Sequence, residues 1–213
     1  HPTAVNMTGI YISCVSGLIA IFGWEMLLTA AGLDPAGFGE VTNRYAAWVR
    51  QYYEALADSD APVIYSHDDI VWTSGAIFRP DWYRRYVFPN LRAHYEPLVA
   101  RGKKVIFVSD GDYTEFIDDI AACGVHGFFF EPLTDLRLLA ERYGQTHVLI
   151  GNVDTRVLLG GTKARIRAEV ERCIAIGRHC PGYFIGVTNM IPANTPVENA
   201  LYYNQIYEGL CSR

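Results

Sequence analysis

The chain has 213 residues, of which 50% are apolar and 19% charged, and its formal net charge is −5. A chain of this length and composition can bury a sizeable core, so we expect one globular domain over residues 1–213. The charges are spread along the chain and form no basic patch, so nucleic-acid binding is not expected. Its apolar runs are interrupted before about 18 residues, and we expect no membrane span.

The five cysteines give an odd count, and no two of them have the spacing of a CxxC motif. This pattern disfavours a disulfide framework and a four-cysteine zinc site, and it favours a reducing cytoplasm. The sequence starts at His1 without an initiator Met or a signal peptide, which suggests a missing N-terminal part.

Six short segments, rich in β-branched and aromatic residues, are predicted to be strands. Most of them are apolar at nearly every position, which is typical of strands covered on both faces in a parallel sheet. In chain order, the predicted strands are residues 5–12, 63–66, 104–108, 127–130, 147–150 and 183–187.

The segments between these strands have the start and stop signals of helices. Pro80 opens a helix predicted over residues 81–100, which Pro89 is expected to kink. Further helices are predicted to begin at Asp112, Thr162 and Thr195. Alternating strands and helices indicate a parallel α/β fold, and this pattern alone fits an open sheet or a barrel. The GxGxxG signature of dinucleotide-binding open sheets follows none of the strands.

The order of four motifs distinguishes these two folds. Residues 67–89, 109–112, 151–162 and 194–199 resemble, in this order, four motifs of the uroporphyrinogen decarboxylase superfamily, which includes cobalamin-dependent methyltransferases. The resemblance implies an α/β fold of the TIM (β/α)8 barrel type, of which this chain supplies the C-terminal six βα units. The two N-terminal βα units would then be absent, leaving a single partial barrel over residues 1–213.

The sequence departs from both well-known branches of this superfamily. The decarboxylase motif FDSW does not match the strand end at residues 66–69. In the thiol-directed methyltransferases, a His-x-Cys pair and a later Cys bind zinc, and the corresponding positions here are Val108, Asp110 and Asn189. We therefore do not assign the complete set of catalytic residues of either branch to this chain.

Polar residues follow the predicted strands, where a barrel places its active site. We expect His67, Asp69, Asp110 and Glu131 to be catalytic. Of these, His67, Asp110 and Glu131 are also candidate zinc ligands, because a carboxylate at the end of an apolar strand is costly to bury unless something compensates its charge. The expected substrate-binding residues are Asp68, Asn152, Asp154 and Asn189.

Several of these residues have a structural alternative. Asp112 is more simply a helix cap, and Asp154 is as well placed to cap a short helix as to bind a ligand. Neighbouring strand residues point to opposite faces, so His67 and Asp69 are expected to face the site together while Asp68 points away. We expect His94 to lie on the surface.

Three functions remain open from the sequence. The first is a corrinoid-dependent methyltransferase or demethylase, which would receive a methyl-corrinoid on a partner protein and could use zinc. The second is uroporphyrinogen decarboxylation, and the third is a barrel that binds a small molecule without catalysis. The oligomeric state is not predicted.

Overall fold

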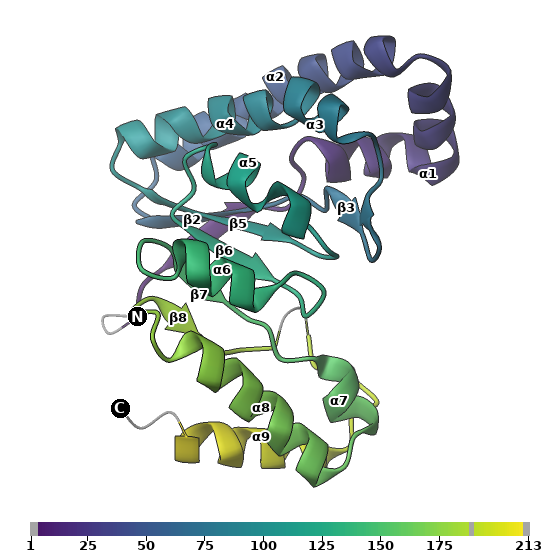
Figure 1. Ribbon diagram of the computed structural model, residues 1–213. Helices are drawn as coiled ribbons and strands as arrows, with labels where there is room; N and C mark the ends of the chain where they lie inside the picture. The colour runs from purple at the N-terminus through teal and green to yellow at the C-terminus, as the bar shows by residue number, and fades with distance from the viewer. Residues whose placement is uncertain (1–3, 188–189, 211–213) are drawn as a thin grey trace. The chain divides into compact units, whose positions relative to one another are not determined.

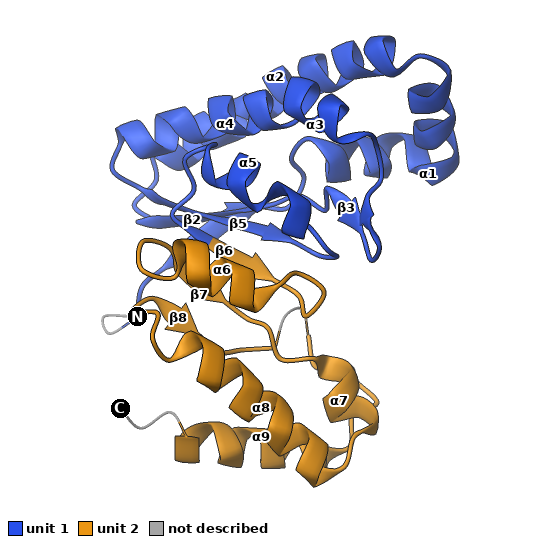
Figure 2. Cartoon of the chain, in the orientation of Figure 1, with its two compact units in different colours: residues 1–127 blue, residues 128–213 orange. Residues whose placement is uncertain are grey.

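A computed structural model describes residues 4–187 and 190–210 of the chain. Two compact units are present, residues 1–127 and 128–213 (Figure 2). Asn189, expected to bind substrate, lies outside the described residues.

The main strands follow one another in chain order, as β1-β2-β5-β6-β7-β8 (Figure 1). In the first unit, β2 pairs in parallel with β1 and with β5, and in the second unit β7 pairs in parallel with β8. The α/β fold with sequential strands is the one predicted from the motifs. The strands are β1 (Met7–Ile10), β2 (Val63–His67), β5 (Lys104–Ser109), β6 (Gly127–Phe130), β7 (Val148–Ile150) and β8 (Tyr183–Phe184).

In the first unit, helices cover one face of the sheet formed by β1, β2 and β5 (Figure 1). Two long helices lie between β1 and β2, and a small antiparallel hairpin follows β2 directly. The elements are α1 (Val15–Leu33), α2 (Pro35–Ala57), β3 (Val71–Trp72), β4 (Gly75–Ala76), α3 (Pro80–Tyr86), α4 (Phe88–Ala100), η1 (Thr114–Phe116) and α5 (Ile117–Ala121).

In the second unit, each strand is followed by helical structure. The helices are α6 (Leu136–Tyr143), α7 (Thr155–Gly160), α8 (Lys163–Gly177) and α9 (Val197–Leu210). The side chains of Asp135, Asp154 and Thr162 cap α6, α7 and α8 by accepting backbone N–H groups of the first turn.

The structure corrects two details of the sequence analysis. The helix predicted over residues 81–100 is divided at Val87 into α3 and α4. His94 is not on the surface but is 1% exposed, with its ring stacked on Tyr53 and its Nε2 2.8 Å from the carbonyl oxygen of Ala46. The residue lies on the face of α4 that packs against α2, which polarity alone did not reveal.

Helix α1 is the one described helix long and apolar enough to cross a membrane. A core helix or a signal sequence would pass the same test, so length and composition are weak grounds for a span. The backbone of Gly23 leaves the helical conformation (φ 68°, ψ 166°) and divides α1 into two helical pieces, and Glu25 follows the break. A bilayer span must satisfy its backbone hydrogen bonds internally, so this break disfavours insertion.

Candidate functional site

Three side chains of the first unit meet where β2 and β5 end. His67 is the last residue of β2, Asp69 follows it by two positions, and Asp110 directly follows β5. Because β2 and β5 are parallel and adjacent, their carboxyl ends lie at the same edge of the sheet. One nitrogen or oxygen of each side chain lies within 4.8 Å of the others, and all three residues are partly buried.

Asp69 organises this cluster. Its Oδ1 lies 2.9 Å from Nε2 of His67 and also accepts a hydrogen bond of 2.9 Å from the backbone N–H of Asp110. The backbone N–H of Asp69 in turn donates to Oγ of Ser16, at 2.7 Å. One carboxylate therefore links the ends of both strands and fixes the imidazole of His67.

The charges of the cluster alter two pKa values. Burial lowers the pKa of His67, but the hydrogen bond with Asp69 and the charges of Asp69, Asp110 and Asp68 outweigh it, and the pKa is raised above its ordinary value. Burial raises the pKa of Asp69, but the hydrogen bonds from His67 and from the N–H of Asp110 lower it overall. Asp69 is thus held as a carboxylate and favours the protonated form of His67.

The aromatic ring of Tyr11 packs against the cluster. It directly follows β1, and its ring meets that of His67 edge to face, with the centroids 4.1 Å apart. Burial and the charges of Asp69 and Asp110 raise the pKa of Tyr11, so its hydroxyl stays protonated near neutral pH. Tyr11 was not identified as a candidate from the sequence, because it lay inside the strand predicted over residues 5–12, which ends at Ile10 in the structure.

Asp68 points away from this cluster, as the strand alternation predicted. Its side chain is fully buried and accepts hydrogen bonds of 2.7–3.1 Å from the backbone N–H groups of Cys14, Val15 and Ser16. These are the first free N–H groups of α1, so Asp68 caps that helix. Burial raises the pKa of Asp68 to about 6, although the backbone hydrogen bonds from Ser16, Val15 and Cys14 act against this rise. Asp68 thus has a structural role at the start of α1, and its expected contact with a substrate stays a prediction.

A tight turn supports Asp110. Gly111 has a φ of 82°, and a Cβ at this position would lie 2.7 Å from the carbonyl oxygen of Trp72. The same carbonyl accepts a hydrogen bond from the backbone N–H of Asp112, at 3.1 Å. The β3–β4 hairpin is thereby attached to the loop that carries Asp110. The side chain of Asp112 accepts from the N–H of Thr114 and stabilises this turn locally, but Asp112 is not the helix cap expected from the sequence, because Tyr113 directly precedes η1.

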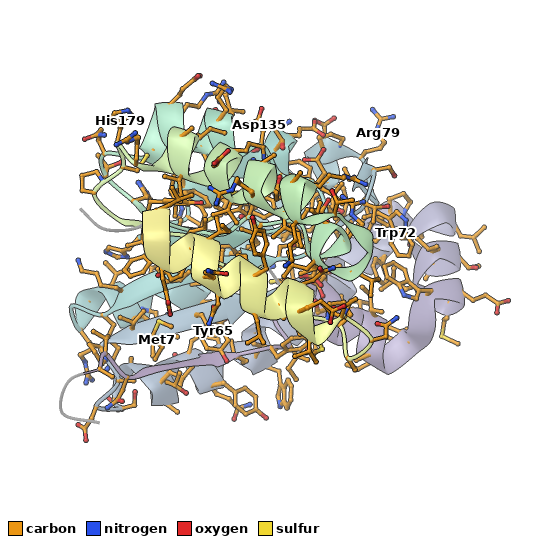
Figure 3. The ribbon with its side chains drawn as sticks, turned by 90° about the horizontal axis from the view of Figure 1, so that it is seen from below. Met7, Tyr65, Trp72, Arg79, Asp135 and His179 are labelled. Carbon is orange, nitrogen blue, oxygen red and sulfur yellow. The ribbon has the colours of Figure 1, made fainter. Side chains whose placement is uncertain are left out.

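The hairpin also carries an exposed aromatic side chain. The ring of Trp72 meets that of Trp24 on α1 edge to face, at a centroid distance of 5.1 Å, and Figure 3 shows Trp72 beside this helix. Both side chains remain substantially exposed. Neither tryptophan was identified as a candidate from the sequence.

In the second unit, Glu131 directly follows β6 and is partly buried. Asn152 is 1% exposed, and its Nδ2 donates to the carbonyl oxygens of Thr134 (3.2 Å) and Glu131 (3.4 Å). Asp154 caps α7 and forms an ion pair with Arg156 at 2.8 Å. Burial raises the pKa of Asp154, but the hydrogen bonds from Arg156 outweigh it and lower the pKa overall.

The structure thus brings together three of the four residues predicted to be catalytic, His67, Asp69 and Asp110. The role of Glu131 stays a prediction, and so does that of Asn189. Asn152 and Asp154 make extensive contacts inside their own unit, and any contact with a substrate stays a prediction.

The comparison with known proteins identifies the family. The family model for uroporphyrinogen decarboxylase (URO-D) matches residues 2–206 of the chain. The chain belongs to the URO-D family. A curated relative, the uroporphyrinogen decarboxylase of Carboxydothermus hydrogenoformans, is 25% identical over 178 residues, which cover 84% of this chain and 49% of the relative. The chain therefore spans about half the length of that URO-D protein.

Solved structures of similar fold support the architecture. A methyltransferase from Methanosarcina mazei superposes with a TM-score of 0.69 at 17% identity, covering 97% of this chain and 59% of the other. A structure from Listeria monocytogenes, named as a candidate vitamin-B12-independent methionine synthase, gives a TM-score of 0.55 at 13% identity, covering 97% and 64%. With the sequential strand order, the likeness confirms the predicted fold of URO-D-family barrels, represented here by six βα units.

Proposed function

We propose that this chain is the catalytic portion of a URO-D-family methyltransferase, which moves a methyl group between a small-molecule substrate and a corrinoid carried by a partner protein. The observation that carries the proposal is the cluster of His67, Asp69 and Asp110 at the ends of adjacent strands. This is the edge of the sheet at which barrel enzymes place their reactive groups. The Methanosarcina mazei structure shows that a protein of similar fold has been assigned a methyl-transfer reaction.

The cluster suits a divalent cation such as Zn²⁺. It offers one imidazole nitrogen and two carboxylates within 4.8 Å of one another, and these are donors that Zn²⁺ accepts in proteins. His67 and Asp110 would hold the ion, and Asp69, whose Oδ1 lies 2.9 Å from Nε2 of His67, would orient the imidazole. A bound cation would polarise the heteroatom that gains or loses the methyl group.

The residues of the chain contribute further chemistry of their own. Asp69 keeps the His67 imidazole in one orientation and raises its pKa, so without a bound cation His67 could deliver a proton to a leaving oxygen or nitrogen. Tyr11 covers one side of this imidazole and restricts the access of water to it. A carboxylate at Glu131 would supply a second acid–base group, as predicted from its place at the end of β6.

Uroporphyrinogen decarboxylation is the second candidate, because the curated relative from Carboxydothermus hydrogenoformans bears that name. In this reading, Asp69 and Asp110 would accept hydrogen bonds from pyrrole N–H groups while CO₂ leaves. Such a site needs carboxylates and no metal ion.

One assay separates the two candidates. The full-length protein is offered uroporphyrinogen in one arm, and a methyl-corrinoid protein with a panel of acceptors in the other, each with Zn²⁺ and with a chelator. We expect methyl transfer in the presence of Zn²⁺ and its loss when the chelator is added. CO₂ release that persists with the chelator would favour the decarboxylase. Absence of turnover in both arms would favour a barrel that binds its ligand without catalysis.

A further inference from the structure

Helix α8 extends two charged side chains to the loop that follows β7. Oε1 of Glu169 accepts a hydrogen bond of 3.0 Å from the backbone N–H of Asp154. Nη2 of Arg172 donates to Asn152 twice, to the side-chain Oδ1 at 3.0 Å and to the backbone carbonyl at 3.2 Å. These contacts hold both ends of the segment from Asn152 to Asp154.

The two charged residues also hold each other. Nε of Arg172 donates to Oε2 of Glu169 at 2.9 Å, and Nη2 donates to Oε1 at 2.7 Å, which makes the ion pair bidentate. The side chain of Glu169 is 13% exposed and that of Arg172 is 38% exposed. The hydrogen bond with Glu169 raises the pKa of Arg172, and partial burial acts against this rise. A bidentate, partly buried ion pair holds its two side chains in one orientation better than a pair in open solvent does.

Asn152 transmits this constraint to the loop after β6. Its Oδ1 accepts from Arg172, while its Nδ2 donates to the carbonyl oxygens of Thr134 and Glu131. Both ends of the amide are therefore used within the unit, and the side chain is 1% exposed. An amide used in this way connects two loops and has little capacity left for a ligand.

We propose that Glu169 and Arg172 are positioning residues, which fix the Asn152–Asp154 loop from α8 and, through Asn152, the backbone of Glu131. Asn152 then connects the loop after β7 to the loop after β6 and does not contact the substrate. The effect on turnover rests on the proposed function, in which Glu131 is a catalytic carboxylate. The effect on the loop does not depend on it.

The same helix offers matched controls. Arg167 and Glu171 form an ion pair at 3.3 Å, with side chains 47% and 51% exposed. Neither side chain makes a hydrogen bond to residues 151–154 within the part of the chain that the structure describes. Arg167→Met and Glu171→Gln therefore remove the same groups from α8 without disturbing the loop.

The first readout is hydrogen exchange and side-chain NMR, in wild type, Arg172→Met, Glu169→Gln and the two controls. We expect exchange of the Asp154 N–H to be about 10- to 100-fold faster in Glu169→Gln, because its charged acceptor is lost. Exchange of the Asn152 side-chain amide should be faster by a similar factor in Arg172→Met, because the guanidinium that holds its Oδ1 is lost and the amide is freer to leave the carbonyls of Thr134 and Glu131. The controls should resemble wild type. Unchanged exchange at both loop positions, or the same increase in the controls, would overturn the proposal, whether or not any activity is found.

The second readout applies once turnover is measured. Arg172→Met should lower kcat about tenfold or more with little change in KM, because misplacing a catalytic group affects the reaction more than binding. Arg172→Lys should recover part of the loss, since a lysine can donate to Asn152 but cannot reproduce the bidentate pair. An equal loss of kcat in Arg167→Met, or unchanged kcat in Arg172→Met, would overturn the positioning of Glu131.

Discussion

The buried imidazole of His94 is a source of pH-dependent stability outside the site. Burial lowers the pKa of His94 from 6.5 to about 4, the hydrogen bond with Ala46 acts against this, and the charge of Arg50 lowers it further. The unfolded chain therefore takes up a proton at a higher pH than the folded chain. The stability from neutral His94 is present above about pH 6.5 and is lost as the pH falls towards 4.

Replacing His94 by Gln should remove this pH dependence, because the amide can still donate to Ala46 but does not titrate. The free energy of unfolding of wild type, measured by urea titration, should fall relative to that of His94→Gln by up to about 3 kcal/mol between pH 6.5 and 4. The difference between the two proteins is the informative quantity, since the raised pKa of Asp68 acts in the opposite direction in both. Parallel curves would show that His94 titrates normally.

Tyr11 gives a second prediction at the scale of one residue. Tyr11→Ala should weaken the binding of Zn²⁺ about two- to tenfold, because the edge-to-face contact that orders the His67 imidazole is lost. Tyr11→Phe keeps this contact and should bind as wild type does in calorimetric titration. Equal losses in both variants would assign the effect to the hydroxyl group instead.

At the scale of elements, the conformation of the loop after β5 depends on Gly111. Gly111→Ala should destabilise the protein by about 2–3 kcal/mol, because a positive φ becomes strained and the new Cβ meets the Trp72 carbonyl. Gly102→Ala is the control, with a φ of 74° and nothing within 4 Å of the added Cβ, and it should cost about 1 kcal/mol. Similar costs for the two variants, from thermal or urea unfolding, would contradict the close approach of the hairpin to this loop.

The elements also show what could be read from the sequence. The strand positions followed from short apolar runs, because a strand covered on both faces needs apolar side chains throughout. The β3–β4 hairpin was missed, since two-residue strands leave little periodic signal. The kink expected from Pro89 is a full division of the helix at Val87, with Pro89 in the first turn of α4. His94 was misplaced because its burial depends on the packing of α2 against α4, which no local pattern specifies.

In the site, too, local sequence patterns predicted some residues, while others depend on tertiary contacts. His67, Asp69 and Asp110 could be predicted because each follows an apolar strand, and parallel pairing brings such ends together. The partner Tyr11 directly follows β1 and the partner Ser16 lies in the first turn of α1, so their proximity to His67 and Asp69 is a tertiary contact. Arg172 and Glu169 are on a helix whose charged residues look like an ordinary solvated face in the sequence.

At the scale of the whole molecule, Glu131 is the predicted catalytic residue of the second unit. Glu131→Gln removes a charge but little volume, so the fold should survive while turnover falls about 10²–10⁴-fold, as is usual for the loss of an acid–base or electrostatic group. Circular dichroism checks the fold, and steady-state kinetics of the full-length protein check the loss. Unchanged turnover would show that the chemistry does not involve Glu131.

Binding of the cation should also depend on pH. Protons and Zn²⁺ compete for His67, and the pKa of this residue is raised by Asp69, so affinity should already decline as the pH falls through that raised value. Titrations at several pH values should show weaker binding in acid and release of a proton on binding. A pH-independent affinity would indicate that His67 is not a ligand.

The measurement that tests the central claim most directly is calorimetric titration of Zn²⁺ into the metal-depleted full-length protein and its Asp110→Asn variant. We expect one ion per chain for wild type, and an affinity at least about tenfold lower for the variant, because a neutral amide replaces a charged ligand. Absence of binding to wild type, or equal affinity in the two proteins, would contradict a cation centre at His67, Asp69 and Asp110.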